Sequence, residues 1–133
     1  PRRTIDAACV LRVEVAGRRL LLTSDIEAVS EAGLLARDTA GLASDVLVVP
    51  HHGSRTSSTP AFIEATRPRW VIFPVGYRNR FRHPNAEVWA RWSASGAGIL
   101  RTDASGAVIV NLGHAGLRVD TARDLAPRYW HGR

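Results

Sequence analysis

The sequence predicts a layered α/β domain, and three observations favour that class. Short apolar runs alternate along the chain with segments of helical periodicity, separated by Gly, Pro or polar residues. The 133 residues, 45% of them hydrophobic, suit one globular domain with a single core. No run approaches the roughly 18 consecutive apolar residues of a membrane span. We therefore expect residues 1–133 to form one soluble domain.

The first part of the chain predicts a β-hairpin followed by a helix. Within residues 8–23, apolar and charged side chains alternate, the chain turns at Ala16 and Gly17, and a more apolar run follows. That pattern is typical of a hairpin whose second strand is central in a sheet. Residues 26–36 predict a helix, and Ser24 or Asp25 just before it can cap its free amides.

The rest of the chain continues the alternation of strand and helix. The run 45–50, DVLVVP, is nearly all apolar, as expected of a strand covered on both faces. Thr59 and Pro60 are typical of a helix start, with Pro at the first helical position. We also expect strands at 69–76, 98–102, 107–112 and 117–121, helices at 60–65 and 85–95, a turn at 103–106 joining two strands, and a peripheral tail over 113–133.

The charges are carried by arginine. All 18 basic residues are Arg, against 12 acidic residues, for a net charge of +6. The planar guanidinium suits phosphate, which makes an acidic polymer such as nucleic acid a reasonable partner. A bias in genome composition explains the same arginine content equally well. Cys9 is the only cysteine, so no disulfide forms within the chain, and its apolar surroundings predict a core position.

Polar residues follow three of the predicted strands. Asp25 follows the run at 19–23, His51 and His52 follow the strand at 45–50, and His83 follows the strand at 69–76. Open α/β sheets commonly place active sites at such strand ends. One carboxylate with two or three imidazoles suits zinc, or manganese if further carboxylates join. The sequence therefore predicts a divalent metal site.

Each residue also has a structural alternative. An Asp before a helix is most often an N-cap, and a His before Pro is usually a loop or cap residue, so Asp25 and His83 carry little alone. The hydroxyl residues of 54–58 could simply bond their own backbone. The pair His51 and His52 has no common structural role, because burying two imidazoles without partners is costly. The prediction therefore depends on their shared placement at strand ends.

Four segments resemble, in order, the metallo-β-lactamase-like domain of ComEC-type competence proteins, the DNA-uptake channel family. They are LLLTSDIE, DVLVVPHHGSRTSS, PVGYRNRFRHPNAEV and GILRTDASGAV, and the similarity runs from about residue 6 to 110. The HHGS segment with the N-x-x-x-HP loop is specific, whereas TGD-type motifs recur across the superfamily. The superfamily's primary metal motif, H-x-[HD]-x-D-H, does not occur. The resemblance therefore implies the C-terminal half of a four-layer αββα sandwich, or a degenerate relative.

The resemblance implies roles for individual residues. Asp25 matches the aspartate that bridges two metal ions, and either His51 or His52 would be a ligand. Ser24 stands where the family has Gly, so we expect strain in that turn. Arg78, Arg80 and Arg82, with Arg55, could hold phosphates. The implied metal ligands are Asp25, His51, His52 and His83, and the implied substrate-binding residues are Ser54, Arg55, Ser57, Arg78 and Asn79.

The activity that the resemblance implies is hydrolysis of a DNA phosphodiester with two divalent ions, zinc or manganese. The implied partners are DNA, the missing N-terminal half of the domain and the membrane channel of a parent protein. That parent would be membrane-attached, with this domain on the extracytoplasmic side. We expect the chain alone to have little or no nuclease activity, and to self-associate through its exposed interface. Two alternatives stay open, a non-catalytic nucleic-acid-binding module and a metallohydrolase of a small ester.

Overall fold

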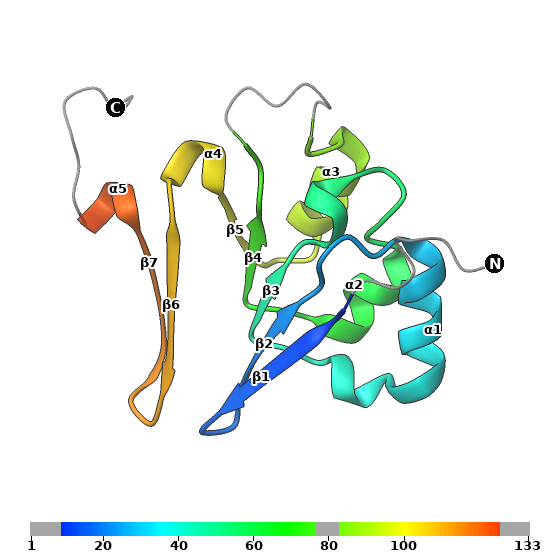
Figure 1. Cartoon of the computed structure of the whole chain (residues 1–133), viewed down its shortest axis with the longest axis horizontal. Helices are drawn as coiled ribbons and strands as arrows, with labels where there is room; N and C mark the ends of the chain where they lie inside the picture. The colour runs from blue at the N-terminus through cyan, green and yellow to red at the C-terminus, as the bar shows by residue number, and fades with distance from the viewer. Residues whose placement is uncertain (1–8, 77–82, 126–133) are drawn as a thin grey trace.

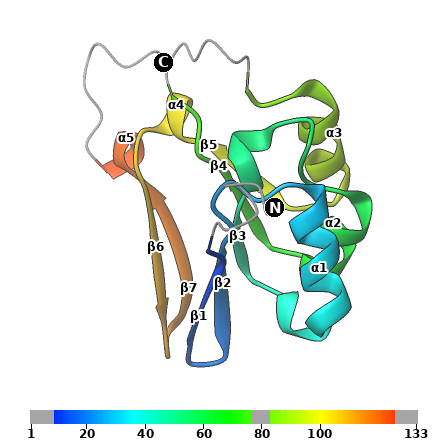
Figure 2. The ribbon, with the colours of Figure 1, turned by 45° about the vertical axis from the view of Figure 1, so that its right-hand side comes forward.

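A five-stranded sheet lies between a layer of helices and a two-stranded hairpin in the computed structural model (Figures 1 and 2). The structure describes residues 9–76 and 83–125. The order of the larger sheet is β1-β2-β3-β4-β5, and β6 pairs with β7 in the second sheet. Helices α1, α2 and α3 cover one face of the larger sheet (Figure 2). This arrangement confirms the predicted α/β class.

The elements follow one another in a simple order along the chain. Residues Ala40–Leu42 and Pro50–Gly53 form short 3₁₀ turns. The strands are β1 (Leu11–Val15), β2 (Arg18–Leu22), β3 (Val46–Val48), β4 (Trp70–Phe73), β5 (Gly98–Arg101), β6 (Val108–Gly113) and β7 (Gly116–Thr121). The helices are α1 (Ala28–Asp38), α2 (Pro60–Thr66), α3 (Ala86–Ala94), α4 (Thr102–Ser105) and α5 (Ala122–Leu125). Among the helices at described positions, none has the length and apolar content needed to cross a bilayer.

The larger sheet is parallel apart from its first strand. β1 runs antiparallel to β2, and β2, β3, β4 and β5 run parallel to one another. Their register places Leu21, Leu47, Val71 and Ile99 in one row across the sheet. The carboxyl ends of parallel strands meet at one edge, so the loops after β2, β3 and β4 converge there.

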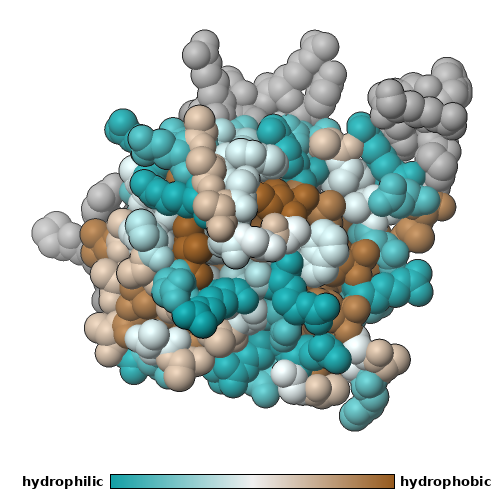
Figure 3. Space-filling model, turned by 180° about the vertical axis from the view of Figure 1, so that it is seen from behind, coloured by the Kyte–Doolittle hydropathy of each residue, from teal (hydrophilic) through white to brown (hydrophobic). Residues whose placement is uncertain are grey.

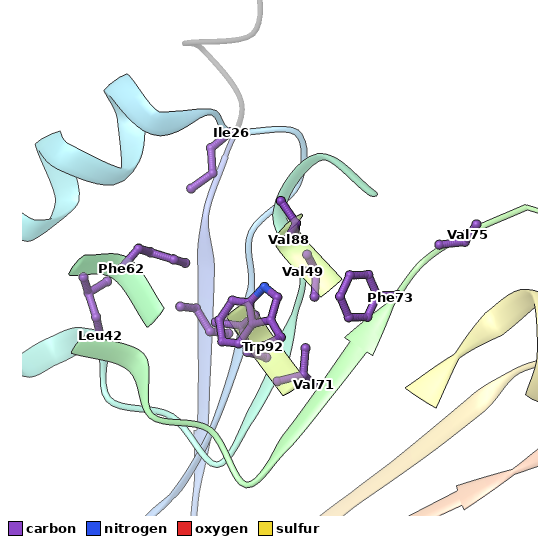
Figure 4. Close-up of a cluster of buried hydrophobic side chains, with 11 residues drawn as sticks. Ile26, Leu42, Val49, Phe62, Val71, Phe73, Val75, Val88 and Trp92 are labelled. Atoms are coloured by element: carbon purple, nitrogen blue, oxygen red, sulfur yellow. The ribbon is translucent and has the colours of Figure 1, made fainter. Parts of the chain in front are cut away.

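The core lies between this sheet and the helices. Trp92, Phe62 and Phe73 are its largest side chains, and each is fully buried. Figure 4 shows Trp92 of α3 among Val49, Val71 and Val88. The start of α2 follows the prediction. The Thr59 hydroxyl accepts the backbone N–H of Phe62, and Pro60 opens α2.

The other face of the sheet is covered less completely, by the hairpin of β6 and β7. No residue of β6 is fully buried, and Ile109 is 38% exposed. Figure 3 shows the surface opposite the view of Figure 1, where apolar areas are interspersed with hydrophilic side chains.

Three predictions from the sequence were wrong in detail. The segment 103–106 is not a simple turn within one sheet. α4 ends at Ser105 and is followed by Gly106 (φ +70°), and β6 pairs with β7 in the second sheet rather than with β5. Cys9 is exposed rather than part of the core. Neither Ser24 nor Asp25 caps α1, which starts at Ala28 after Glu27 with no side-chain cap.

Candidate functional site

A pocket of about 380 Å³ lies at the carboxyl-end edge of the larger sheet. Asp25 reaches it from the loop after β2, and His51 and His52 from the turn after β3. The segment after β4 forms another wall. The complete lining is Asp25, His51, His52, Pro74, Val75, Gly76 and His83. The four candidate metal ligands named from the sequence therefore share one pocket.

An unusual backbone presents the two adjacent histidines. His51 (φ +51°) and His52 (φ +55°) both occupy the left-handed region, which costs a non-glycine residue roughly 1–2 kcal/mol. The backbone N–H of His51 donates to the Ser24 carbonyl at 2.9 Å, tying the turn to the Asp25 loop. Gly53 follows at φ +82°, where an added Cβ would lie 2.8 Å from the Cβ of Pro84. Strain of this kind collects at functional sites.

Ser24, next to Asp25, is strained as the sequence predicted. Its φ is +53°, in the region that favours glycine, and the family motif that this segment resembles has glycine there.

His52 is held in one orientation by a backbone carbonyl. Its Nδ1 lies 2.7 Å from the Pro74 oxygen. A carbonyl can only accept, so Nδ1 carries the proton. The other nitrogen, Nε2, lies 3.3 Å from Asp25 Oδ1. In the neutral imidazole, two electron pairs therefore face each other across that gap. A second proton on His52 or a shared cation would satisfy both.

The other two imidazoles, those of His51 and His83, line the same pocket as His52. The ring centroids of His51 and His83 are 6.3 Å apart, and the His83 ring lies 6.3 Å from His52, nearly parallel to it. Burial, and then the positive charges that His52 and His51 can carry, lower the pKa of His83. A lowered pKa favours the neutral imidazole, which is the form that ligates metals.

The hydroxyl-rich loop supports the histidines rather than lining the pocket. The Thr56 hydroxyl lies 3.4 Å from His51 Nδ1 and 3.1 Å from the Ser54 hydroxyl. Ser57 is 1% exposed, and its hydroxyl donates to the Pro50 carbonyl. Ser54 and Ser57 therefore act on the loop in this structure, and Thr56 is the hydroxyl that contacts a histidine.

A buried carboxylate anchors the end of this loop. Glu31 of α1 is 0% exposed and accepts the backbone N–H groups of Ser58 at 2.6 Å and Thr59 at 2.8 Å. Burial raises the pKa of Glu31, although these hydrogen bonds oppose the shift. Glu31 was not among the residues predicted from the sequence. Its helical spacing from Leu34 and Leu35, on the apolar face of α1, was the available signal.

The predicted phosphate-binding residues are only partly described. Arg55 is exposed beside the histidine turn. Arg78, Asn79, Arg80 and Arg82 lie outside the described residues.

The spacing of Asp25 and His52 suits two ligands of one metal ion. Two ligands about 2.1 Å from a tetrahedral zinc lie about 3.4 Å apart, and the 3.3 Å between Asp25 Oδ1 and His52 Nε2 matches that separation. Over residues 9–76 and 83–125, no three His, Cys, Asp or Glu side chains converge closely enough to hold an ion. The described residues thus fit part of a metal site, with two ligands in place.

Sequence comparison relates the chain to segments of much longer proteins. It is 39% identical over 132 residues to Competence protein ComA of Neisseria gonorrhoeae, covering 97% of this chain and 19% of that protein. It is 32% identical over 125 residues to Uncharacterized protein YcaI of Escherichia coli, covering 93% of this chain and 17% of that protein. It is also 32% identical over 108 residues to ComE operon protein 3 of Bacillus subtilis, covering 81% and 14%. No protein-family model matches the chain. The chain spans less than a fifth of the length of these relatives.

Proposed function

Since this chain is homologous to one segment of competence-type proteins, we propose that it forms part of a metal-dependent DNA phosphodiesterase that serves DNA uptake. The proposal assigns it the second half of a metallo-β-lactamase-like domain. The order of TSD, HHGS and HP along the chain supports this, as does their convergence on one pocket.

The facing pair of Asp25 and His52 is the observation that carries the proposal. Lone pairs of a carboxylate and an imidazole at 3.3 Å repel unless a proton or a cation lies between them. The site also contains backbone strain, because His51 and His52 both have left-handed conformations. A divalent ion held by Asp25 and His52 would explain both features.

The chain's own residues divide the work of the site. Asp25 and His52 hold the ion, and the Pro74 carbonyl keeps the ligating nitrogen of His52 turned towards the pocket. When bound, a divalent ion supplies an activated water and neutralises charge on a phosphate. His83, whose pKa is lowered, stays neutral near the pocket and can accept a proton. Arg55 attracts the phosphate backbone from outside the pocket.

The site is completed by a longer protein. Two ligands are fewer than the three or four protein ligands of a zinc site, so the isolated chain has little or no nuclease activity. The missing ligands come from the first half of the domain, which also covers the partly exposed face of the sheet. The parent protein is membrane-attached, with this domain on the extracytoplasmic side of its channel. A second copy of the chain can cover the same face when that half is absent.

Zinc binding tests the proposal directly. The isolated chain is titrated with Zn²⁺ by calorimetry, and Asp25→Asn and His52→Gln are each expected to weaken binding at least about tenfold. His114→Gln is the matched control, since His114 is exposed in the turn between β6 and β7. Equal zinc affinity in all four proteins would refute the assignment of Asp25 and His52.

DNA cleavage separates the proposal from its two rivals. The parent protein is expected to cleave DNA with Mn²⁺ or Zn²⁺, and Asp25→Asn in that protein to abolish cleavage. A non-catalytic binding module would bind DNA without metal, with an affinity that falls steeply as salt rises. A metallohydrolase of a small ester would hydrolyse the ester and not bind DNA.

A further inference from the structure

We propose that Thr102 is a positioning residue of this site, because its hydroxyl fixes the carbonyl that orients His52. The motif around it, Arg101-Thr102-Asp103, has no role in the proposed function so far. The effect on metal binding rests on that proposed function, whereas the effect on His52 orientation does not.

The end of β4 needs an outside hydrogen-bond partner. The ladder between β4 and β5 stops at Phe73, which pairs with Arg101, and Pro74 has no N–H with which to continue it. Val75 comes next and is 4% exposed. A buried backbone N–H without a partner is destabilising.

Thr102 supplies the partner that Val75 needs. Its hydroxyl oxygen accepts the Val75 N–H at 2.8 Å, and the hydroxyl proton points to the Val75 carbonyl at 2.9 Å. The Phe73 carbonyl is further away, at 3.4 Å. One side chain therefore satisfies both backbone groups of Val75, as a paired strand would.

The neighbours of Thr102 keep that hydroxyl in place. The Arg101 guanidinium makes two hydrogen bonds to the Asp103 carboxylate, at 2.9 Å and 2.7 Å. It also lies over the Trp89 ring, 5.4 Å from the centroid. Bidentate pairing fixes the geometry as well as the charge. The two charged residues thus brace the start of α4, and Thr102 reaches from it to β4.

The consequence falls on Pro74, which lies between two fixed residues. Phe73 is held in the ladder and Val75 by Thr102, so the Pro74 carbonyl has little freedom to rotate. That carbonyl accepts from His52 Nδ1 at 2.7 Å and leaves Nε2 facing Asp25. Thr102 therefore controls, through the backbone, which nitrogen of His52 carries the proton, and keeps Nε2 unprotonated where it faces Asp25.

The test compares variants that remove or keep the hydroxyl. Thr102→Val removes it at nearly constant shape, and Thr102→Ser keeps it. Two-bond ¹H–¹⁵N NMR of the imidazoles reports the tautomer well above the ordinary His pKa of about 6.5. The His52 signals are assigned by their loss in His52→Gln. The wild type and Thr102→Ser are expected to hold the Nδ1–H tautomer, and Thr102→Val to shift towards Nε2–H.

Thr66→Val is the matched control. The Thr66 hydroxyl is also buried and also donates to a backbone carbonyl, that of Phe62, but it lies within α2. This variant is expected to lose stability and keep the His52 tautomer. If Thr102→Val does not fold, Thr102→Ala replaces it, with the same expected shift. A folded hydroxyl-free variant with an unchanged His52 tautomer overturns the inference.

Zinc affinity tells a failure of this inference from a failure of the proposed function. If the chain binds zinc, Thr102→Val is expected to weaken binding by about tenfold and Thr102→Ser to restore it. If the wild type binds no zinc, the proposed function fails, and the tautomer measurement still decides the role of Thr102.

Discussion

The two faces of the five-stranded sheet differ in how completely they are covered. On the helix side, Leu21 and Val71 are 2% and 0% exposed. On the hairpin side, Val46 and Ile72 of the central strands are buried as well, but Leu20, Leu22 and Leu100 of the flanking strands are only half-buried. A hairpin of two strands is too narrow to seal five. Nearly all-apolar strands therefore predict that both faces of a sheet are buried, but they do not predict how completely the same chain buries each face.

The largest effect is expected on the sealed face, at Trp92. Trp92→Ala removes a fully buried ring and its hydrogen bond to the Ser58 hydroxyl, at a cost of about 3–5 kcal/mol in the free energy of unfolding. Trp89→Ala on the same helix is the control, because Trp89 is half-buried and should cost clearly less. Urea denaturation gives both values. Equal losses would contradict the difference in packing.

A pair of neighbouring leucines compares the two faces within one strand. Leu21 of β2 points to the helices and Leu22 to the other side, so Leu21→Ala should cost about 2–5 kcal/mol and Leu22→Ala about 1 kcal/mol. Thermal unfolding of the two variants side by side measures the gap. A larger loss for Leu22→Ala would mean that the hairpin side is the better sealed.

Glu31 provides a pH-dependent test on the helix side. Burial raises its pKa in the folded protein above the ordinary value of 4.5, so folding favours the protonated form. The stability that this shift contributes is fully present below about pH 4.5 and is lost as pH rises through the folded-state pKa. Glu31→Gln cannot titrate and should lack this component.

Denaturation at a series of pH values from 4 to 7 measures this component. The free energy of unfolding of the wild type, minus that of Glu31→Gln, should fall as pH rises. Glu64→Gln, on the exposed surface of α2, is the control for removing a carboxylate charge at a site away from the core. If the stability of the wild type relative to Glu31→Gln grew with pH instead, the pKa of Glu31 would be lowered by folding and not raised.

The smallest effect is expected at the outer surface of the hairpin. Ile109 is 38% exposed, and Ile109→Thr should change the free energy of unfolding by less than about 0.5 kcal/mol in the isolated chain. In the parent protein the same change should cost more if another segment covers this surface. Paired urea melts of chain and parent would compare the two.

The sequence predicted what local pattern controls. The strands around Leu47 and Val71 and the cap at Thr59 follow from side-chain periodicity and hydrogen-bonding chemistry within a few residues. The partner of β6 did not follow, because pairing across a sheet depends on the tertiary fold. The sequence also left Asp25 open as a helix cap. Only the folded structure shows that α1 starts three residues later, at Ala28.

Within the site, the gathering of residues was predicted and their supports were not. Strand ends meet at one edge of a parallel sheet, so the approach of Asp25 to His52 was accessible from sequence. The Pro74 carbonyl and the Thr102 hydroxyl act through the backbone of another strand, which no spacing in the sequence indicates. Left-handed histidines are equally hidden, since residue type alone favours the opposite conformation.

The strand order of the larger sheet has a consequence for folding during synthesis. Each strand from β2 to β5 pairs with the strand synthesised just before it, so none has to insert between two strands that are already paired. A chain emerging from the ribosome can therefore extend this sheet edge by edge. Of the described residues that shape the pocket, Thr102 is synthesised last, directly after β5, so the Pro74 carbonyl gains its support only when β5 has left the ribosome.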